Sequence, residues 1–178
     1  MELICRTTAE LTPEQQSELR RLFDRAWGGK GGTFDDNDWQ AALGGTHFML
    51  AENGVIVSHA AVVERTLEFA GKPVRTGYVE AVATLPERQG EGHATRVMAE
   101  VNAFIDREYA IGALGAAAPE FYARIGWAPW RGLTAARTSD GVRMTPEEDG
   151  HIFVRPVEAA AVPADALLVC AGRPGDPW

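Results

Sequence analysis

The residues whose types and spacing best suit chemistry are six consecutive ones, Gln-Gly-Glu-Gly-His-Ala, at positions 89–94. Glycines in such a loop let the backbone turn its N–H groups toward a common centre. The pattern after the loop predicts a helix, and a helix N-terminus carries the positive end of the helix dipole. The loop therefore predicts an anion site, most often one for a phosphate group.

The spacing narrows the type of phosphate loop. The chain holds no GxxxxGK[ST] string, which excludes a Walker A loop. Gly90 and Gly92 are followed by Thr95, where a dinucleotide fingerprint needs its third glycine. Gln89, Gly92 and Ala94 instead fit the pattern Q/R-x-x-G-x-G/A. An ordinary turn between a strand and a helix is the alternative.

Two elements must position this loop. Residues 75–84 are rich in Val, Tyr and Thr and are followed by Pro86, so they predict a strand. Strand alternation would place Glu80 on the same face as Tyr78 and Val82. After the loop, apolar residues recur at steps of three and four and predict a long helix. They are Ala94, Val97, Met98, Val101, Phe104 and Ile105.

The rest of the pattern predicts an α+β chain. Thr12-Pro13 starts one helix, and Asp35, followed by further acids, starts a short second one. Asn53-Gly54 between apolar runs is a strong hairpin signal. Residues 28–32 predict a mobile glycine loop. Further strands are expected at 3–5, 47–51, 55–64, 111–114, 152–154 and 167–170, and a short helix between 119 and 126, with irregular connections elsewhere.

Length and composition bound the class of protein. The 178 residues suit one domain, residues 1–178, and 46% hydrophobic residues allow a proper core. A formal net charge of −8 argues against nucleic acid and anionic membranes as partners and suits a cationic one. Cys5 and Cys170 give no disulfide framework. With no signal peptide and no membrane-spanning run expected, the predicted location is the cytoplasm.

A second motif, Tyr122-Ala-Arg-Ile-Gly126-Trp127, follows the predicted helix. Together with the loop, it resembles the GCN5-related N-acetyltransferase superfamily. The resemblance implies a mixed, mostly antiparallel central sheet flanked by helices, with a splayed strand over residues 75–84. It implies acetyl-CoA as cosubstrate, with its pyrophosphate on the loop and its sulfur near Tyr122. The implied cofactor-binding residues are Val82, Ala83, Thr84, Gln89, Gly90, Glu91, Gly92, His93, Ala94 and Thr95.

A narrower resemblance covers nearly the whole chain. TGYVEAVAT, IGALGAAAPEFYARIGWAPWRG, TPEEDGHIFV and GDPW are similar to stretches of the aminoglycoside 2'-N-acetyltransferases. The resemblance implies that Glu80 acts on the 2'-amine of the substrate, through water, and that Tyr122 faces the cofactor sulfur. It also implies that the carboxylate of Trp178 helps to seat the antibiotic. The implied acidic contacts to the cationic substrate are Asp38, Glu148 and Asp176.

The expected chemistry requires a base, because a protonated amine cannot attack a thioester. Glu80 is the candidate base, directly or through a water, and a strand glutamate that faces solvent is the alternative reading. The phenol of Tyr122 stays protonated at neutral pH and can donate to the leaving thiolate. Backbone groups of residues 82–84 are expected to pair with the cofactor arm, and an N–H near Val82 or Ala83 to hold the oxyanion.

Other readings stay open. Residues 114–122 and the tail CAGRPGDPW depart from the family where antibiotic contacts are expected, so the preferred aminoglycoside is open, with kasugamycin as one candidate. Another small amine or a peptide N-terminus is a second substrate class, and a non-catalytic CoA-binding domain is a third reading. A homodimer is implied by resemblance only. The four histidines have no metal spacing, so no metal is predicted.

Overall fold

The two longest strands, β3 (Val55–Phe69) and β4 (Lys72–Thr84), each contribute residues to two units of the chain. The computed structural model describes residues 1–28, 34–156 and 165–178. The first unit comprises Met1–Val63 and Val79–Ala103, and the second comprises Glu64–Tyr78 and Phe104–Trp178. One catalytic domain over residues 1–178 stays a prediction. Beyond Gly28, the predicted glycine loop lies outside the described residues.

Antiparallel pairing organises the strands of the first unit. β1 (Glu2–Thr7) pairs with β2 (Thr46–Glu52), and β2 pairs with β3. The turn between β2 and β3 lies at Asn53 and Gly54, whose φ angles are 50° and 81°. Positive φ at both central residues matches the twist of the flanking strands. The predicted hairpin is therefore confirmed.

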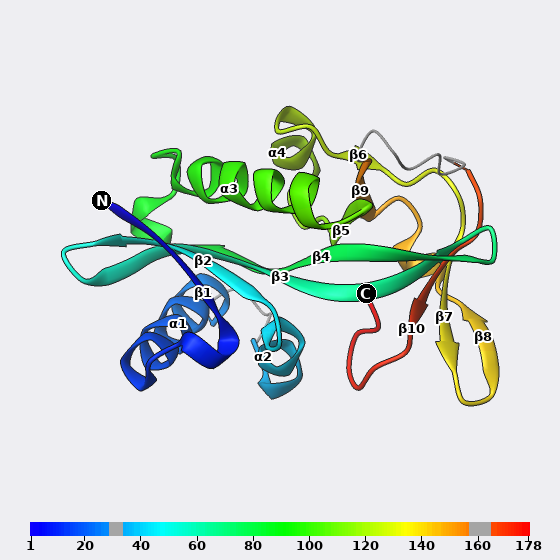
Figure 1. The fold of residues 1–178 in the computed structure, drawn as a ribbon, viewed down its shortest axis with the longest axis horizontal. Coiled ribbons are helices and arrows are strands. Elements are labelled where there is room, and N and C mark those ends of the chain that lie inside the picture. The colour runs from blue at the N-terminus through cyan, green and yellow to red at the C-terminus, as the bar shows by residue number, and fades with distance from the viewer. Residues whose placement is uncertain (29–33, 157–164) are drawn as a thin grey trace. The chain divides into compact units, whose positions relative to one another are not determined.

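The helices of the first unit begin at the expected residues. α1 (Pro13–Trp27) is capped by Thr12, whose hydroxyl accepts the Gln15 N–H at 3.2 Å. α2 (Asp36–Ala42) and α3 (His93–Glu108) follow, and the end of α3 runs into the second unit. In Figure 1, α1 and α2 lie on one side of the strands of the first unit and α3 on the other. The short 3-10 helices are η1 (Thr8–Glu10) and η2 (Pro86–Arg88).

In the second unit, β5 (Ile111–Gly115) is parallel to β4, from Thr76 opposite Ile111 to Tyr78 opposite Ala113. On its other side, β5 is antiparallel to β9 (Ile152–Pro156), which also pairs with β6 (Ala128–Pro129). α4 (Pro119–Arg124) connects β5 to β6. These elements confirm the expected strand at 111–114 and the short helix that opens at residue 119.

The second unit also contains a ribbon of three strands, of which the sequence predicted the one at 167–170 and missed the other two. β10 (Leu168–Ala171) lies between β3 and β7 (Thr134–Thr138), and β7 pairs with β8 (Gly141–Met144). The expectation of irregular chain over residues 134–144 is wrong. All four residues of β8 are exposed, so no alternation marks it. β7 is fixed by distant partners, namely its parallel pairing with β10 and a 2.6 Å ion pair between Arg137 and Glu68.

Buried residues from several strands form the core of the second unit. Its members include Leu67, Phe69, Tyr78, Ile111, Ala113, Trp130, Ala136, Ile152, Val154, Leu168, Cys170 and Trp178. Among the described residues, the strand pairs are mostly antiparallel, with β4–β5 and β10–β7 parallel. The predicted α+β class with a mixed, mostly antiparallel sheet and flanking helices is confirmed. A short 3-10 helix, η3 (Pro146–Glu148), precedes β9.

Candidate functional site

The glycine loop of the first unit joins η2 to the N-terminus of α3. Gly90 and Gly92 have φ angles of 83° and 82°, in the left-handed region that favours glycine. The carbonyl of Gly92 accepts the N–H of Arg96 at 3.1 Å, which starts the helical hydrogen bonds. The N–H groups of residues 93–95 precede that bond and have no partner inside the helix. This backbone suits a phosphate group, as the sequence predicts.

One cation and two carboxylates surround the start of this loop. Arg88 contacts Glu52 at 2.6 Å and Glu91 at 3.0 Å. The hydrogen bond with Glu52, followed by the one with Glu91, raises the pKa of Arg88. His93 Nε2 lies 3.0 Å from Glu91 and 3.2 Å from Arg88 Nη2. The side chains of Glu91 and His93 are therefore engaged in contacts within the loop. The groups of the loop that can bind an anion are its backbone N–H groups.

The end of β4 leads through η2 into this loop, and Ser58 on β3 anchors the end of the strand. The Ser58 hydroxyl donates to the Ala83 carbonyl at 3.0 Å and lies 2.9 Å from the Thr84 hydroxyl. The Leu85 N–H donates to the Val57 carbonyl at 3.0 Å. These contacts fix the backbone of the segment that is predicted to pair with the cofactor arm.

Glu80 lies on β4 just before this anchored segment and is half-buried. The next residue, Ala81, has a φ of 51°, which is left-handed and unusual for a residue with a side chain. A strand that leaves the extended conformation cannot keep a simple alternation of faces. The alternation predicted for Glu80 and Val82 is therefore wrong, and Glu80, Ala81 and Val82 are all half-buried in succession.

Tyr122 lies on α4 in the second unit and is 6% exposed. Burial raises the pKa of its phenol to about 12. Its ring centroid lies 5.1 Å from Phe121 and 6.4 Å from Phe153 on β9. The motif ends in a turn: Gly126 has a φ of 92°, and the Trp127 N–H donates to the Tyr122 carbonyl at 3.1 Å. Tyr122 is thus a neutral hydrogen-bond donor held by aromatic packing.

Trp178 is the centre of a second cluster in this unit and is 5% exposed. Its indole N–H donates to the Thr145 hydroxyl at 3.0 Å, and its backbone N–H donates to Asp176 Oδ1 at 2.9 Å. Arg173 donates to the backbone oxygen of Trp178. Arg65 donates to the preceding carbonyl, that of Pro177, at 2.6 Å.

Glu148 belongs to the same cluster. Burial, followed by the negative charge of Asp176, raises the pKa of the Glu148 carboxyl. Two carboxylates that repel each other lose that repulsion when a cation binds between or beside them. The structure therefore brings together three of the predicted substrate residues, Glu148, Asp176 and Trp178.

Asp38 lies in the first unit, in the first turn of α2. Its Oδ2 accepts the Asp35 N–H at 2.9 Å, while Asp35 Oδ1 accepts the N–H groups of Asn37 and Asp38. In this reciprocal capping box the Asp38 carboxylate stabilises the N-terminus of α2. The first unit thus holds Glu80, residues 82–84, the loop and Asp38. The second holds Tyr122 and the cluster around Trp178.

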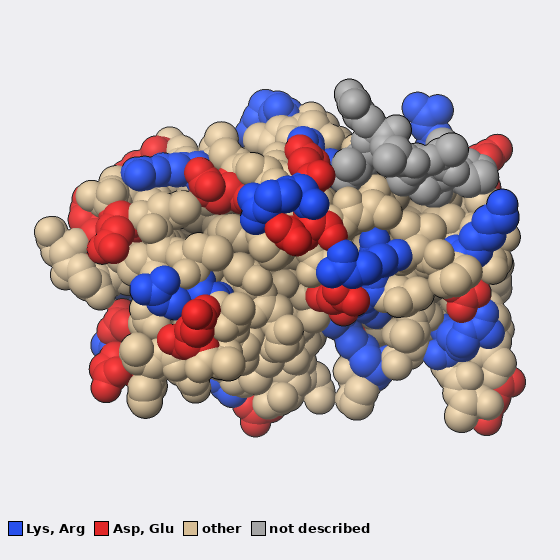
Figure 2. Space-filling view, viewed as in Figure 1, with Lys and Arg blue, Asp and Glu red and all other residues tan. Residues whose placement is uncertain are grey.

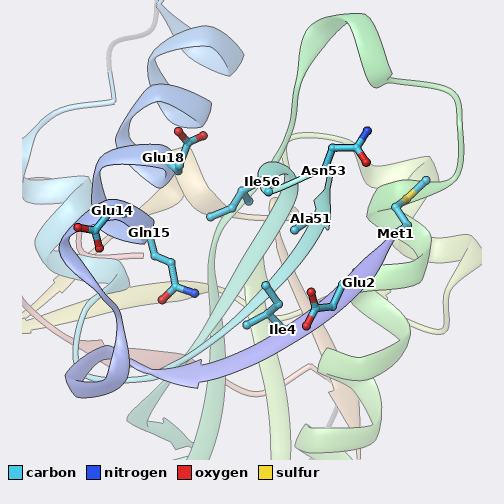
Figure 3. Close-up of a pocket in the computed structure, with 10 residues that line it drawn as sticks. Met1, Glu2, Ile4, Glu14, Gln15, Glu18, Ala51, Asn53 and Ile56 are labelled. Atoms are coloured by element: carbon cyan, nitrogen blue, oxygen red, sulfur yellow. The ribbon is translucent and has the colours of Figure 1, made fainter.

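A separate pocket of about 430 Å³ opens in the first unit (Figure 3). Acidic side chains of Glu2, Glu14 and Glu18 line it, beside apolar side chains such as Ile4 and Ile56. None of the residues predicted to bind cofactor or substrate lines this pocket. Figure 2 shows Lys and Arg interspersed with Asp and Glu over the face in view, so the acidic excess is not gathered there.

Sequence reasoning missed the residues that hold these groups in place. His47 and His59 are completely buried and contact each other, although their sequence positions show no pattern. Thr145 and Arg65 bind the chain end from 33 and 112 residues away, and no local signal marks such partners. Among the described residues there is no group of three or more His, Cys, Asp or Glu that could hold a metal ion. No helix there is long and apolar enough to cross a membrane.

The fold and the loop together define an acyltransferase of the GNAT class. Residues 7–130 match the family described as an acetyltransferase (GNAT) domain, and the chain belongs to this family. The aminoglycoside 2'-N-acetyltransferase of Mycolicibacterium fortuitum is 39% identical over 176 residues. That alignment covers 96% of this chain and 89% of the relative.

Solved structures support the fold. A GNAT family N-acetyltransferase (YhbS) from Escherichia coli in complex with CoA has a TM-score of 0.65 at 13% identity, over 96% of this chain and 90% of that one. A GNAT family acetyltransferase from Brucella melitensis in complex with acetyl-CoA has a TM-score of 0.55 at 20% identity, over 71% of this chain and 83% of that one. These neighbours confirm the predicted fold family, and the family membership confirms an N-acetyltransferase.

Proposed function

We propose that this protein transfers the acetyl group of acetyl-CoA to the 2'-amino group of an aminoglycoside. The fold is that of the N-acetyltransferases, and the relative from Mycolicibacterium fortuitum carries this activity in its name. One observation carries the choice of substrate: the negative charge of Asp176 acts on the Glu148 carboxyl and raises its pKa, and Asp176 also accepts the backbone N–H of the buried Trp178. Two neighbouring carboxylates favour a ligand that carries an ammonium group.

Acetyl-CoA would be bound through its pyrophosphate at the N-terminus of α3. The N–H groups of residues 90–95 would hold the two phosphates, and the positive φ of Gly90 and Gly92 supports this fit. Backbone groups of residues 82–84 would align the extended arm, because Ser58 fixes this segment. The bound cosubstrate supplies an activated acetyl thioester, and CoA is known to bind to the E. coli neighbour.

The proposed reaction is a direct transfer. The amine nitrogen attacks the thioester carbonyl, the new C–N bond forms and the C–S bond breaks. Before the attack the ammonium group gives one proton to Glu80, directly or through a water, and the nitrogen loses its second proton to solvent as the amide forms. The leaving thiolate takes a proton from the Tyr122 phenol, whose raised pKa keeps it protonated before the reaction, and the phenolate that is left regains a proton from solvent. Acid–base help of this kind contributes about 10²–10⁴-fold.

Several narrower points belong to the same proposal. A role in resistance to the antibiotic and a homodimeric state are proposed from the family resemblance of the sequence alone, and a cytoplasmic location from its residues. Kasugamycin also offers a 2'-amine, and it stays a candidate because residues 114–122 and the tail depart from the family pattern. The alternative substrate class is another small amine or a peptide N-terminus.

A thiol-release assay with acetyl-CoA tests the proposal. The panel is gentamicin, tobramycin and kasugamycin, each with a 2'-amine, and kanamycin A, which carries a 2'-hydroxyl. Spermidine and a short peptide represent the alternative substrates. The proposal predicts CoA release with at least one 2'-amine and none with kanamycin A. Turnover confined to spermidine or the peptide would contradict it.

A further inference from the structure

Two histidines in the first unit contact each other in the interior. His47 lies on β2 and His59 on β3, and both are 0% exposed. His47 Nδ1 lies 3.0 Å from His59 Nε2. The His59 ring also packs edge-on against Phe23, with the centroids 5.1 Å apart.

Each histidine has one further partner. His59 Nδ1 lies 2.8 Å from the Ala81 carbonyl oxygen, and His47 Nε2 lies 2.9 Å from the Thr8 hydroxyl. The Thr8 oxygen accepts the Gly44 N–H at 2.9 Å. The result is a chain of hydrogen bonds that runs from a loop, through both imidazoles, to the backbone of β4.

The direction of every bond follows from the Ala81 carbonyl, which can only accept. His59 must therefore carry its proton on Nδ1, which leaves Nε2 as an acceptor in the neutral ring. His47 must then donate from Nδ1, which leaves its Nε2 to accept the Thr8 hydroxyl proton at 2.9 Å; the Gly45 carbonyl, 3.3 Å from the same hydroxyl, is its more distant acceptor. Burial lowers the pKa of His47 to about 4 and that of His59 to about 3, so both rings are neutral at pH 7.

The chain ends at the one peptide of β4 that leaves the strand conformation. Ala81 has a φ of 51°, and a residue with a Cβ adopts this region only when its surroundings hold it there. Ala81 lies directly between Glu80 and Val82. A different φ at Ala81 would turn the backbone on both sides of it and would change the direction of the Glu80 side chain.

We propose that His59 is a positioning residue: its Nδ1–H holds the Ala81 carbonyl and thereby sets the direction of Glu80 and of the backbone that follows. His47 donates to His59 Nε2 and so supports the tautomer that the Ala81 carbonyl requires. This inference deepens the proposed function and rests on it for the role of Glu80. An apolar pair would fill the same space without hydrogen bonds to satisfy, so burial alone does not account for two imidazoles.

The test uses two substitutions that remove the His59 ring. One is designed to keep the hydrogen bond to Ala81 and the other to keep the hydrogen bond to His47. In His59→Asn, the amide nitrogen takes the place of Nδ1 and retains the bond to Ala81. In His59→Gln, the amide reaches toward His47, and the donor to Ala81 is lost. Both variants leave a similar void, so a similar fall in melting temperature checks that they are matched.

For acetylation of tobramycin we expect kcat of His59→Gln to fall about tenfold or more, because small errors in positioning are costly. His59→Asn should stay within about threefold of wild type. The KM for acetyl-CoA should change little in either. Equal losses of kcat in the two variants would overturn the proposal.

Nuclear magnetic resonance gives a readout that does not need turnover. Nitrogen-15 spectra should show His47 and His59 as neutral rings protonated on Nδ1. The carbonyl carbon signal of Ala81 should move in His59→Gln and stay near its position in His59→Asn. A ring protonated on Nε2, or an Ala81 signal that is the same in His59→Gln, would overturn the inference. A wild-type protein that acetylates no aminoglycoside would count against the proposed function alone.

Discussion

The indole N–H of Trp178 donates a 3.0 Å hydrogen bond to the Thr145 hydroxyl, and both residues are buried. Thr145 in turn donates to the Thr134 hydroxyl at 2.9 Å. Thr134 is anchored by its backbone N–H, which donates to Asp149 Oδ1 at 2.8 Å. A fixed set of hydroxyls thus holds the ring that lies beside the proposed cation site.

Thr145→Val tests this anchor. The change keeps the shape of the side chain but leaves the indole N–H of Trp178 buried and unpaired, at a cost of about 1–3 kcal/mol. That cost falls on stability. Because the ring is no longer held, we also expect the proposed cation site beside it to be misplaced and the KM for tobramycin to rise about fivefold, as a loss of ~1 kcal/mol in binding would give. The KM for acetyl-CoA should stay near wild type. Thr145→Ser keeps the hydroxyl and is the control. A KM for tobramycin that is the same in both variants would contradict the proposed role of Trp178.

Glu148→Gln tests the acidic pair. Removing one carboxylate should raise the KM for tobramycin about fivefold, the effect of ~1 kcal/mol for a half-exposed charge pair. In the wild type, burial and the charge of Asp176 raise the pKa of Glu148. As the pH falls, Glu148 therefore becomes neutral at a higher pH than an ordinary carboxyl does. On acidification, the KM of the wild type for tobramycin should therefore begin to rise at a higher pH than that of Glu148→Gln, which has no carboxyl to protonate at this position. Glu147→Gln changes an exposed neighbour and is the control. Identical steady-state constants in Glu148→Gln and wild type would exclude this contact.

Glu80→Gln tests the proposed base. The amide cannot accept the amine proton, so kcat at pH 7 should fall about 10²-fold or more, and the rise of activity with pH should change its shape. Glu100→Gln, at an exposed position of α3, is the control and should behave as wild type. Wild-type turnover of Glu80→Gln at pH 7 would remove Glu80 from the mechanism.

Tyr122→Phe tests the proposed acid. The phenyl ring keeps the packing against Phe121 and Phe153 but cannot protonate the thiolate. We expect kcat to fall about 10²-fold, with little change in CoA affinity by calorimetry. Since the pKa of Tyr122 is about 12, the wild type should show no loss of kcat from ionisation of this phenol up to about pH 10. Tyr109→Phe, on the same unit, is the control. Full activity of Tyr122→Phe would assign Tyr122 to packing.

The buried histidines predict how stability depends on pH. Both rings are neutral in the folded protein, with pKa values of about 4 for His47 and about 3 for His59. The unfolded chain protonates its histidines near pH 6.5. Between about pH 6.5 and 4 the unfolded state binds more protons, so the free energy of unfolding falls with falling pH, by up to ~1.4 kcal/mol per pH unit for each histidine. Urea unfolding at several pH values measures this slope, and His59→Asn should lower it. A slope that is the same in the variant would contradict the neutral pair.

Local residue patterns predicted the parts of the site that depend on nearby residues. Gly90 and Gly92 in the left-handed region, the turn at Gly126 and the hairpin at Asn53-Gly54 are set by residues that favour positive φ, so the sequence reveals them. The amphipathic pattern likewise predicted α3.

Contacts over long sequence distances were not predictable in this way. Ala81 carries no turn signal, because its left-handed φ is held by His59, 22 residues away. That is why alternation failed at Glu80. β7 and β8 were missed since the exposed side chains of β8 show no pattern and β7 depends on β10.

The most direct test of the account is the position of the new acetyl group. The protein is incubated with acetyl-CoA and with each 2'-amino aminoglycoside of the panel that releases CoA, and the product is examined by nuclear magnetic resonance. The account predicts a single acetyl group on the 2'-nitrogen, and no product from kanamycin A under the same conditions. An acetyl group on any other amine, or acetylation of kanamycin A, would contradict it.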